Sequence, residues 1–378
     1  KLSAAPFPAG YAATATNYRG EAQFLRALCY YSLLQLYARP YTDATLGSVG
    51  SRPGLPLRLT PETQLGNNDL ARSTVGQVYD QILLDLGEAE KNLPLSYTAA
   101  QGSISTSTLN VTRAHRNSVI ALRTRVYLTM GRYSDVVTEA NRLVPTAAPY
   151  AAPAGVANAL HSSIVAVFTP PQETTETMLA FPFTAQDPPG TQNQLAYYYL
   201  PTSLGGNGEY GLNTSTSATT GGILANAGFA ATDVRRTSFV ASVGTERFLT
   251  KYPTGTPYTD KAPVIRYSEV MLSLAEALVR TTNTVDTRAL ALLNAVRTRS
   301  NGAAYSATGL TASTMLDAIL LERRIEFLGE GIRNIDLMRL NATIPAKGTV
   351  GAVDPLNVLY VWPIPSTELA TNTLMTRN

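Results

Sequence analysis

The chain has 378 residues, of which 44% are hydrophobic and only 15% are charged, with a formal net charge of +3. This length is more than one small hydrophobic core usually serves, so we expect two lobes or one extended helical array. The small net charge leaves no basic stripe or tail, which argues against nucleic-acid binding. The low charged fraction leaves the polar surface to Thr, Ser, Asn, Gln and Tyr, which suits uncharged, hydroxyl-rich ligands.

The first predicted helix covers residues 18–38. Its apolar side chains recur at i, i+3, i+4 and i+7, and further tyrosines and leucines widen the apolar face almost all round. Such a helix belongs inside a bundle, so we expect Cys29 to be a small core residue. The positions that set the period are Phe24, Leu25, Leu28, Cys29, Ser32, Leu33 and Leu36.

Three further segments complete the N-terminal part. Residues 39–70 are rich in Pro, Gly, Asn and Thr, which indicates a long loop. Ser73 and Thr74 are good N-caps and predict a second helix from residue 75 that stops at Pro94. Residues 96–110 are rich in Ser and Thr and have the composition of a linker.

A helix pair is predicted next, over RNSVIALRTRVYLTM and RYSDVVTEANRLV. Tyr127, Gly131, Tyr133 and Ala140 lie near the spacings of a tetratricopeptide repeat, in which small residues let paired helices approach closely. The match is degenerate. The segment that follows, up to residue 260, has many Pro, Gly, Asn and Thr residues and only short apolar runs, which predicts an irregular lobe with a few strands or short helices.

Helical periodicity returns towards the C-terminus. Residues 264–280 and 286–300 predict a second repeat-like helix pair, and residues 314–331 and 332–340 predict two more helices, before a proline-punctuated, extended tail. We therefore expect a mainly all-α fold, a tetratricopeptide-like α-α superhelix with an irregular, loop-rich ligand-binding lobe. In the single domain so predicted, the helical scaffold is 18–145 and 262–345, the insert lobe 146–261 and the tail 346–378.

Several kinds of site are excluded by the sequence. One cysteine allows no internal disulfide and no cysteine-based zinc site, and the two histidines, His115 and His161, have no metal-ligand spacing. No nucleophile-elbow, Walker A or dinucleotide motif occurs, so we expect no metal and no cofactor. No apolar run reaches the ~18 residues that span a bilayer, and the N-terminus lacks a signal-peptide pattern. These observations fit a cytosolic protein or one whose targeting segment has been removed.

A charge cluster in the C-terminal third has two interpretations. Glu322 and Glu326 are one helical turn apart, as are Glu326 and Glu330 if the helix continues through Gly329, which would suit a glycosidase carboxylate pair. Catalytic carboxylates, however, usually flank the bond from different elements, and adjacent arginines would keep these acids ionised. We therefore favour ion pairs that lock one helix to the next. The cluster comprises Glu322, Arg323, Arg324, Glu326, Glu330, Arg333, Asp336 and Arg339.

Arg266, Glu269 and Glu276 present the same choice and are interpreted as structural. Arg266 and Glu269 are three residues apart, so they can pair on one helix.

The tyrosines are the candidates for ligand contact. Aromatic rings stack on the C–H faces of sugars or on peptide side chains, and the phenol adds a hydrogen bond. Loops present such side chains on a rigid scaffold, although alternation along a strand would bury part of any run of tyrosines. The candidates are Tyr41, Tyr197, Tyr198, Tyr199, Tyr210, Tyr252 and Tyr258, with Asn193 and Asn207 as polar contacts. GGNGEYG, residues 205–211, is expected to form a flexible loop at the rim of the site.

Six segments, taken in order, together resemble the SusD/RagB family of nutrient-binding proteins from Bacteroidetes outer membranes. The resemblance covers nearly the whole chain from residue 18 and is strongest after residue 264. The segments are EAQFLRALCYYSLLQLY, ARSTVGQVYDQILLDLGEAEKNLP, APVIRYSEVMLSLAEAL, ALALLNAVRTRS, LLERRIEFLGEGIRNIDLMRL and VWPIPSTELATNTLMTRN.

The resemblance implies a lipid-anchored protein on the extracellular face of the outer membrane. Such a protein captures oligosaccharides or peptides without catalysis and delivers them to a TonB-dependent transporter of the SusC/RagA type. The sequence departs from the family pattern in two ways. The lipoprotein signal and lipid-bearing cysteine are not in this chain, so Cys29 is not the lipidated residue and an N-terminal segment is expected to be missing. The only tryptophan, Trp362, lies in the tail motif, so no tryptophan platform for glycans is evident.

Two alternatives from other classes remain at this point. One is an α-helical glycoside hydrolase or lyase, which needs two carboxylates facing each other across a cleft. The other is a repeat-type scaffold that binds only proteins.

Overall fold

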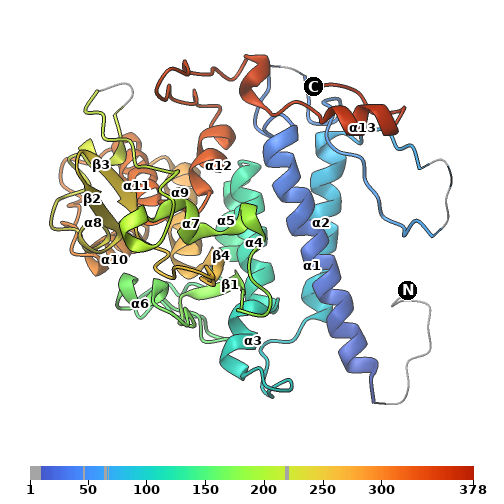
Figure 1. Cartoon of the computed structure of the whole chain (residues 1–378), viewed down its shortest axis with the longest axis horizontal. Coiled ribbons are helices and arrows are strands. Elements are labelled where there is room, and N and C mark those ends of the chain that lie inside the picture. The colour runs from blue at the N-terminus through green and yellow to red at the C-terminus, as the bar shows by residue number, and fades with distance from the viewer. Residues whose placement is uncertain (1–9, 46, 64–65, 67, 218–220) are drawn as a thin grey trace. The chain divides into compact units, whose positions relative to one another are not determined.

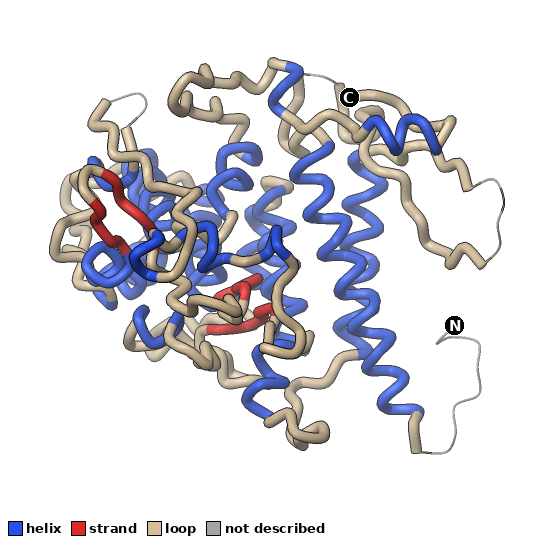
Figure 2. Tube along the Cα trace, in the orientation of Figure 1, coloured by secondary structure: helices blue, strands red, loops and turns tan. Residues whose placement is uncertain are grey.

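The computed structural model describes residues 10–45, 47–63, 66, 68–217 and 221–378. Helices make up most of its regular structure, and the strands are few and short (Figure 2). The expected all-α class is therefore confirmed. Two antiparallel two-stranded sheets occur, β1 (Thr177–Phe181) with β4 (Ala262–Arg266) and β2 (Val240–Val243) with β3 (Glu246–Leu249).

The chain divides into two compact units, and their bounds differ from the scaffold and insert expected from composition. The first unit comprises residues 1–93, 126–132 and 334–378, and the second comprises residues 94–125 and 133–333. Helices α4 (Arg116–Thr129) and α12 (Ile332–Arg339) each contribute residues to both units. The expectation of a single domain stays a prediction.

The first unit is built on two long helices that lie side by side and run in opposite directions (Figure 1), α1 (Ala12–Tyr37) and α2 (Val75–Asn92). Thr74 caps α2 through a capping box with Gln77, as the sequence predicted for this position. Gly20 permits the close approach, because a Cβ there would lie 2.8 Å from Leu93 Cγ. The remaining elements of this unit are η4 (Val358–Tyr360) and α13 (Ser366–Thr371).

The prediction that Cys29 belongs to the core is wrong. Tyr30 and Tyr31 of α1 are buried, but Cys29 is exposed, and Leu25 and Leu33 retain 45% and 40% of their exposure. These three residues follow one another at four-residue spacing, so they form a single stripe on α1 that nothing in the described chain covers. The apolar run is wider than the face that the helix buries.

The second unit holds most of the short elements. The pair predicted over residues 116–144 is present as α4 and α5, and the pair predicted over residues 264–300 is present as α9 and α10. The helices of this unit other than α4 and α12 are α3 (Thr106–Thr112), α5 (Tyr133–Ala140), α6 (Ile164–Phe168), η1 (Thr191–Asn193), α7 (Leu195–Tyr199), η2 (Thr202–Leu204), η3 (Ile223–Ala225), α8 (Val234–Phe239), α9 (Tyr267–Thr282), α10 (Thr287–Arg299) and α11 (Ala312–Glu326).

Three predicted boundaries need correction. The supposed linker 96–110 contains the start of α3, which Ser105 caps by accepting a hydrogen bond from Thr108 N. The segment that begins at residue 264 starts as strand β4, and its helix begins only at Tyr267. Helix α11 ends at Glu326, because the chain turns at Gly329, where φ is +79°.

His115 makes the stability of the second unit depend on pH. Its side chain is fully buried at the start of α4, and burial lowers the pKa of His115 from 6.5 to about 4. A histidine whose pKa is lower in the folded state stabilises the fold fully above pH 6.5, and this contribution is lost as the pH falls towards 4. The contribution is about 3 kcal/mol at neutral pH.

We expect the free energy of unfolding to fall by about 2 kcal/mol between pH 6.5 and 5, a window that lies above the usual carboxylate pKa range. Denaturant unfolding at a series of pH values measures it. His161→Asn should keep this slope and His115→Leu should lose it. In the His161→Asn variant the one remaining histidine signal should not titrate by NMR between pH 8 and 5. A signal that titrates near 6.5 would contradict the assignment.

Candidate functional site

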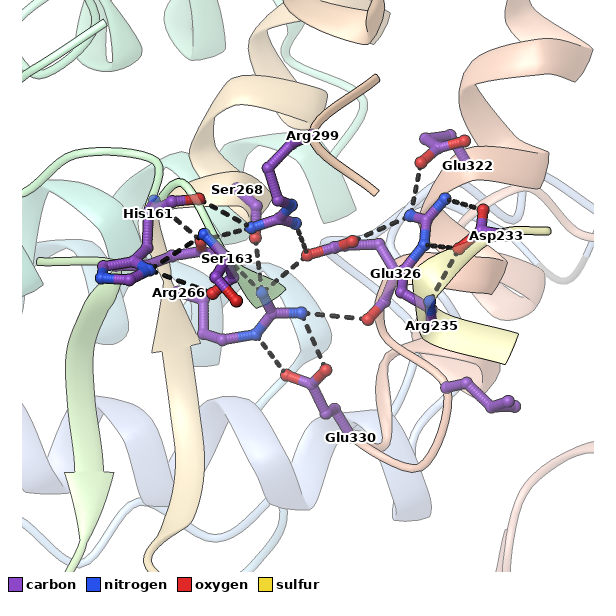
Figure 3. Close-up of polar contacts among 12 residues, drawn as sticks. His161, Ser163, Asp233, Arg235, Arg266, Ser268, Arg299, Glu322, Glu326 and Glu330 are labelled. Atoms are coloured by element: carbon purple, nitrogen blue, oxygen red, sulfur yellow. Dashed lines mark hydrogen bonds and ion pairs between the residues drawn. The ribbon is translucent and has the colours of Figure 1, made fainter. Parts of the chain in front are cut away.

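The second unit contains a continuous, buried network of charged side chains (Figure 3). Its members come from several elements and the loops between them, and every one has a side chain no more than 7% exposed. Five cations face five carboxylates, so the formal charges balance. The cations are Arg235, Lys251, Arg266, Arg297 and Arg299, and the carboxylates are Glu176, Asp233, Glu322, Glu326 and Glu330.

Arg266 is the centre of this network. Its Nη1 donates to Glu326 Oε1 at 2.8 Å and to Glu176, and its Nε donates to Glu330 Oε2 at 2.8 Å. The guanidinium also lies between two rings, 5.3 Å from the Phe168 centroid and 5.0 Å from the Phe327 centroid. Three carboxylates therefore share one cation that has lost nearly all contact with water.

The electrostatics of the network keep Glu326 and Glu330 ionised. Burial alone would raise the pKa of Glu326, but the charges of Arg299, Arg266 and Arg235 outweigh it and hold this pKa well below the usual range. Burial would likewise raise the pKa of Glu330, but the charges of Arg266 and Lys251 outweigh this effect and lower it. A general acid needs a raised pKa, so neither carboxylate is suited to protonate a leaving group.

The interpretation of the charge cluster as ion pairs is confirmed, but two details of it are wrong. Arg266 does not pair with Glu269, which instead binds Arg125 at 2.5 Å. Glu326 and Glu330 do not lie on one helical face, because α11 has ended before Gly329. Sequence reasoning missed six of the ten members, because no spacing in the sequence links them to the cluster. They are Glu176, Asp233, Arg235, Lys251, Arg297 and Arg299.

Beside this network the second unit gathers the predicted tyrosines. Tyr197, Tyr198 and Tyr199 lie on α7, so successive rings point about 100° apart rather than to opposite faces as on a strand. Tyr198 and Tyr210 stack with ring centroids 5.1 Å apart and an interplanar angle of 18°. Tyr199 meets Tyr210 edge to face at 5.7 Å, and Tyr197 meets Tyr258 edge to face at 5.6 Å.

The glycine-rich segment brings Tyr210 back over α7 as a tight turn. Asn207 N donates to Tyr197 O at 2.7 Å, and Tyr210 N donates to Tyr198 O at 3.0 Å. Gly206 has no room for a side chain, because a Cβ there would lie 2.1 Å from Leu200 O. The loop is therefore fixed by backbone hydrogen bonds and is not the flexible rim that its composition suggested.

The predicted contact residues differ in exposure. Tyr210 is 52% exposed, and Asn193 and Asn207 are also exposed, while Tyr197, Tyr198, Tyr199 and Tyr258 are half-buried. Tyr252 is a core residue with 1% exposure, so the prediction that it contacts ligand does not fit this structure. Glu209, missed from the sequence because a lone acid beside glycines has no distinctive pattern, accepts a hydrogen bond from Asn207 Nδ2 at 2.8 Å.

The charged network holds the base of the tyrosine cluster. Lys251 Nζ donates to Glu330 Oε1 at 2.7 Å and to Leu328 O at 3.0 Å. The adjacent Tyr252 donates its hydroxyl to Gly329 O at 3.0 Å and packs against Tyr199 with centroids 5.8 Å apart. Lys251 and Tyr252 therefore both hold the turn after α11 by hydrogen bonds, and Tyr199 packs against the fixed ring of Tyr252.

Tyr41 lies in the first unit, where its ring meets Tyr79 edge to face at 5.0 Å. Its predicted contact with ligand stays a prediction. Within the part of the chain that the structure describes, no helix is both long and apolar enough to cross a bilayer.

The comparisons with known proteins decide the family. The model of the SusD family matches residues 124–378. The chain belongs to the SusD family. A second family model, described as starch-binding associating with outer membrane, matches residues 10–128. A search of curated proteins gave no match.

Several solved structures share the fold, among them SusD superfamily proteins. A SusD superfamily protein from Bacteroides fragilis is 30% identical with a TM-score of 0.79, over 96% of this chain and 76% of that chain. Surface glycan-binding protein A from Bacteroides uniformis is 19% identical, TM-score 0.71, over 100% and 80% of the two chains. A laminarin binding SusD-like protein is 21% identical, TM-score 0.70, over 100% and 81%. The fold is the helical, tetratricopeptide-like fold of the SusD superfamily.

The network predicts that Glu326→Gln destabilises the second unit. The substitution leaves Arg235, Arg266 and Arg299 with an uncompensated buried charge, and breaking such a pair costs about 3–5 kcal/mol. Asp317→Asn, an exposed position on the same helix, is the matched control and should cost less than ~0.5 kcal/mol. Denaturant unfolding measures both.

The same substitution should change the acid dependence of stability. Because the folded pKa of Glu326 is depressed, its contribution is present above the unfolded pKa of about 4.5 and is lost as the pH falls below it. Glu326→Gln should therefore flatten the fall in unfolding free energy below pH 4.5. An unchanged slope would show that the pKa of Glu326 is not depressed in the folded protein.

Proposed function

We propose that this SusD protein binds neutral oligosaccharides without cleaving them, at the surface built by Tyr197, Tyr198, Tyr199, Tyr210 and Tyr258. The observation that carries the proposal is the stack of Tyr198 on Tyr210, which leaves Tyr210 52% exposed. Tyr198 stacks on the Tyr210 ring and Tyr199 meets it edge to face, while about half of the residue is open to solvent. A ring held in this way is a ready platform for the C–H face of a sugar.

Polar groups around the platform suit a hydroxyl-rich ligand. The exposed amides of Asn193 and Asn207 and the carboxylate of Glu209 offer donors and acceptors next to the aromatic rings. The Tyr198 hydroxyl donates to Gln192 Oε1 at 3.3 Å, so this phenol is oriented before any ligand arrives. Carbohydrate is favoured over peptide because two of the similar structures are described as glycan-binding and laminarin-binding proteins.

The proposal excludes catalysis on the chemistry of the acids. Glu326 and Glu330 are paired with arginines and with Lys251, and Glu209 is exposed and accepts a hydrogen bond from Asn207. Asp260 is buried, and burial raises its pKa, but both of its carboxylate oxygens already accept hydrogen bonds, from Gln172 and Thr254. Glycoside hydrolysis needs two carboxylates facing each other across the bond. Incubation with a panel of glycans should therefore give binding without products, and product formation would refute the proposal.

The proposal extends to the cellular setting of the family. The protein would be lipid-anchored on the extracellular face of the outer membrane and would pass its ligand to a TonB-dependent transporter of the SusC type. The description of the second family model supports the outer-membrane part. Fatty-acid labelling and protease shaving of cells that express the full-length protein test it, and an unlabelled, protected protein would contradict it.

Tyr210→Ala should weaken the binding of neutral oligosaccharides about tenfold, because it removes the stacking surface. Tyr210→Phe should bind nearly as well as the native protein, and Tyr198→Ala should bind more weakly because the buttress is lost. Tyr11→Ala is the control, since Tyr11 is 62% exposed in the first unit. Calorimetric titration measures affinity, and melting temperatures should change little. Unchanged affinity in Tyr210→Ala would place the site elsewhere.

Gly206→Ala should disturb the platform without touching a tyrosine. The added methyl cannot lie 2.1 Å from Leu200 O, so the loop must open and Tyr210 must leave Tyr198. Gly211→Ala is the matched control, because its Cβ would meet Arg247 O at an ordinary 3.7 Å. We expect faster hydrogen exchange at the amides of Asn207 and Tyr210 and weaker glycan binding in Gly206→Ala alone. Equal exchange in the two variants would contradict the tight turn.

A further inference from the structure

The first unit contains a pocket with an unusual combination of groups. Its volume is about 160 Å³, and it lies where the C-terminal segment (red in Figure 1) passes the end of α1, since Trp362 N donates to Leu36 O at 2.8 Å. The walls are largely apolar, yet two guanidinium groups line them. The lining residues are Arg39, Arg52, Pro53, Val358, Val361 and Asn378.

Both arginines are held by backbone carbonyls and not by acids. Arg52 is 3% exposed and donates through Nη2 to Tyr41 O at 2.9 Å and through Nη1 to Pro40 O. Arg39 donates through Nη2 to Asn357 O at 2.8 Å and through Nη1 to Pro355 O. Neither forms an ion pair with any carboxylate of the described residues, and Arg52 Nε is buried without an acceptor.

A third cation stands behind the pocket. Arg72 donates to Pro53 O at 3.1 Å and to Gly54 O at 2.7 Å, again to carbonyls alone. Asp43 is the acid whose charge acts on Arg52 through space. Its Oδ1 accepts hydrogen bonds from the amide and hydroxyl of Thr45, and its Oδ2 is buried without a hydrogen-bond partner. Burial lowers the pKa of Arg52, as expected for a desolvated cation whose charge is only partly compensated.

We propose that this pocket binds a carboxylate that carries a short aliphatic group. Each guanidinium keeps unused N–H donors, and a carboxylate is the acceptor whose geometry matches them. The apolar part of the ligand would lie against Val358, Val361 and Pro53. The carboxylate could belong to a free branched-chain acid or to an acidic side chain of a peptide flanked by apolar residues.

The rim of the pocket suits such a ligand. Val358, which lines the pocket, is 78% exposed. Leu359 and Trp362, which adjoin lining residues in sequence, are 70% and 59% exposed, a high exposure for large apolar residues. An anion alone would leave this apolar rim in water, whereas an aliphatic carboxylate covers part of it. The inference does not depend on the glycan platform, which belongs to the other unit.

Fluorescence of Trp362 tests the proposal, because it is the only tryptophan in the chain and adjoins Val361 of the pocket. Titration with sodium isovalerate should change the emission and saturate, and the neutral isostere isovaleramide should give no saturable change. A second pair of probes is acetyl-Leu-Glu-Leu-amide and acetyl-Leu-Gln-Leu-amide. Saturation by the glutamate peptide but not by isovalerate would assign the carboxylate to a peptide.

Variants separate pocket binding from nonspecific charge. Arg39→Gln should weaken binding of the carboxylate probes at least tenfold, as should Val358→Asp, a substitution at an exposed position that places a negative charge at the mouth. Arg58→Gln, which removes an exposed arginine paired with Glu62, should leave binding unchanged. Equal response to acid and amide, no response to any of the four probes, or equal loss in Arg58→Gln overturns the proposal.

Discussion

The buried position of Arg266 is the constraint on which the second unit depends. A guanidinium that has left water costs several kcal/mol unless its charge and donors are met, and here Glu176, Glu326 and Glu330 meet them together. These three carboxylates come from a loop before β1, the end of α11 and the turn after it. These carboxylates also pair with further cations, Glu176 with Arg299 and Glu330 with Lys251. The ion pairs therefore hold together segments that lie far apart in the sequence.

This chain of requirements extends to the candidate ligand surface. Lys251 and Tyr252 are neighbours, and both are tied to the turn at residues 328–330, one by its ammonium and the other by its hydroxyl. Tyr199 rests on Tyr252, and Tyr210 rests on Tyr199 and Tyr198. The salt-bridge network therefore positions the Tyr210 ring through two successive aromatic contacts. Ordering the platform in advance lowers the entropy cost of binding a flexible glycan.

The sequence predicts best the features that depend on neighbours in sequence. The cap at Thr74 and the two repeat-like pairs depend on residues within a few turns, and they are present as expected. The predictions for Cys29 and for the Arg266–Glu269 pair were wrong because other elements decide burial and partner choice. Packing decides which face of α1 is buried, and Arg125 is the residue that pairs with Glu269. The family resemblance gave the fold correctly, since six ordered segments carry more information than any one period.

The two candidate binding surfaces of this SusD protein, the tyrosine platform and the pocket near Trp362, differ in their chemistry. In the second unit, tyrosines with the amides of Asn193 and Asn207 and the carboxylate of Glu209 beside them offer stacking and hydrogen bonds, which suits neutral sugars and disfavours anions. In the first unit, Val358, Val361 and Pro53 line a pocket together with two arginines that form no ion pair with a carboxylate of the described residues. A neutral sugar has no charge to offer those arginines, and an aliphatic acid has no ring of hydroxyls to offer the tyrosines. Each surface is therefore tested with its own class of probe.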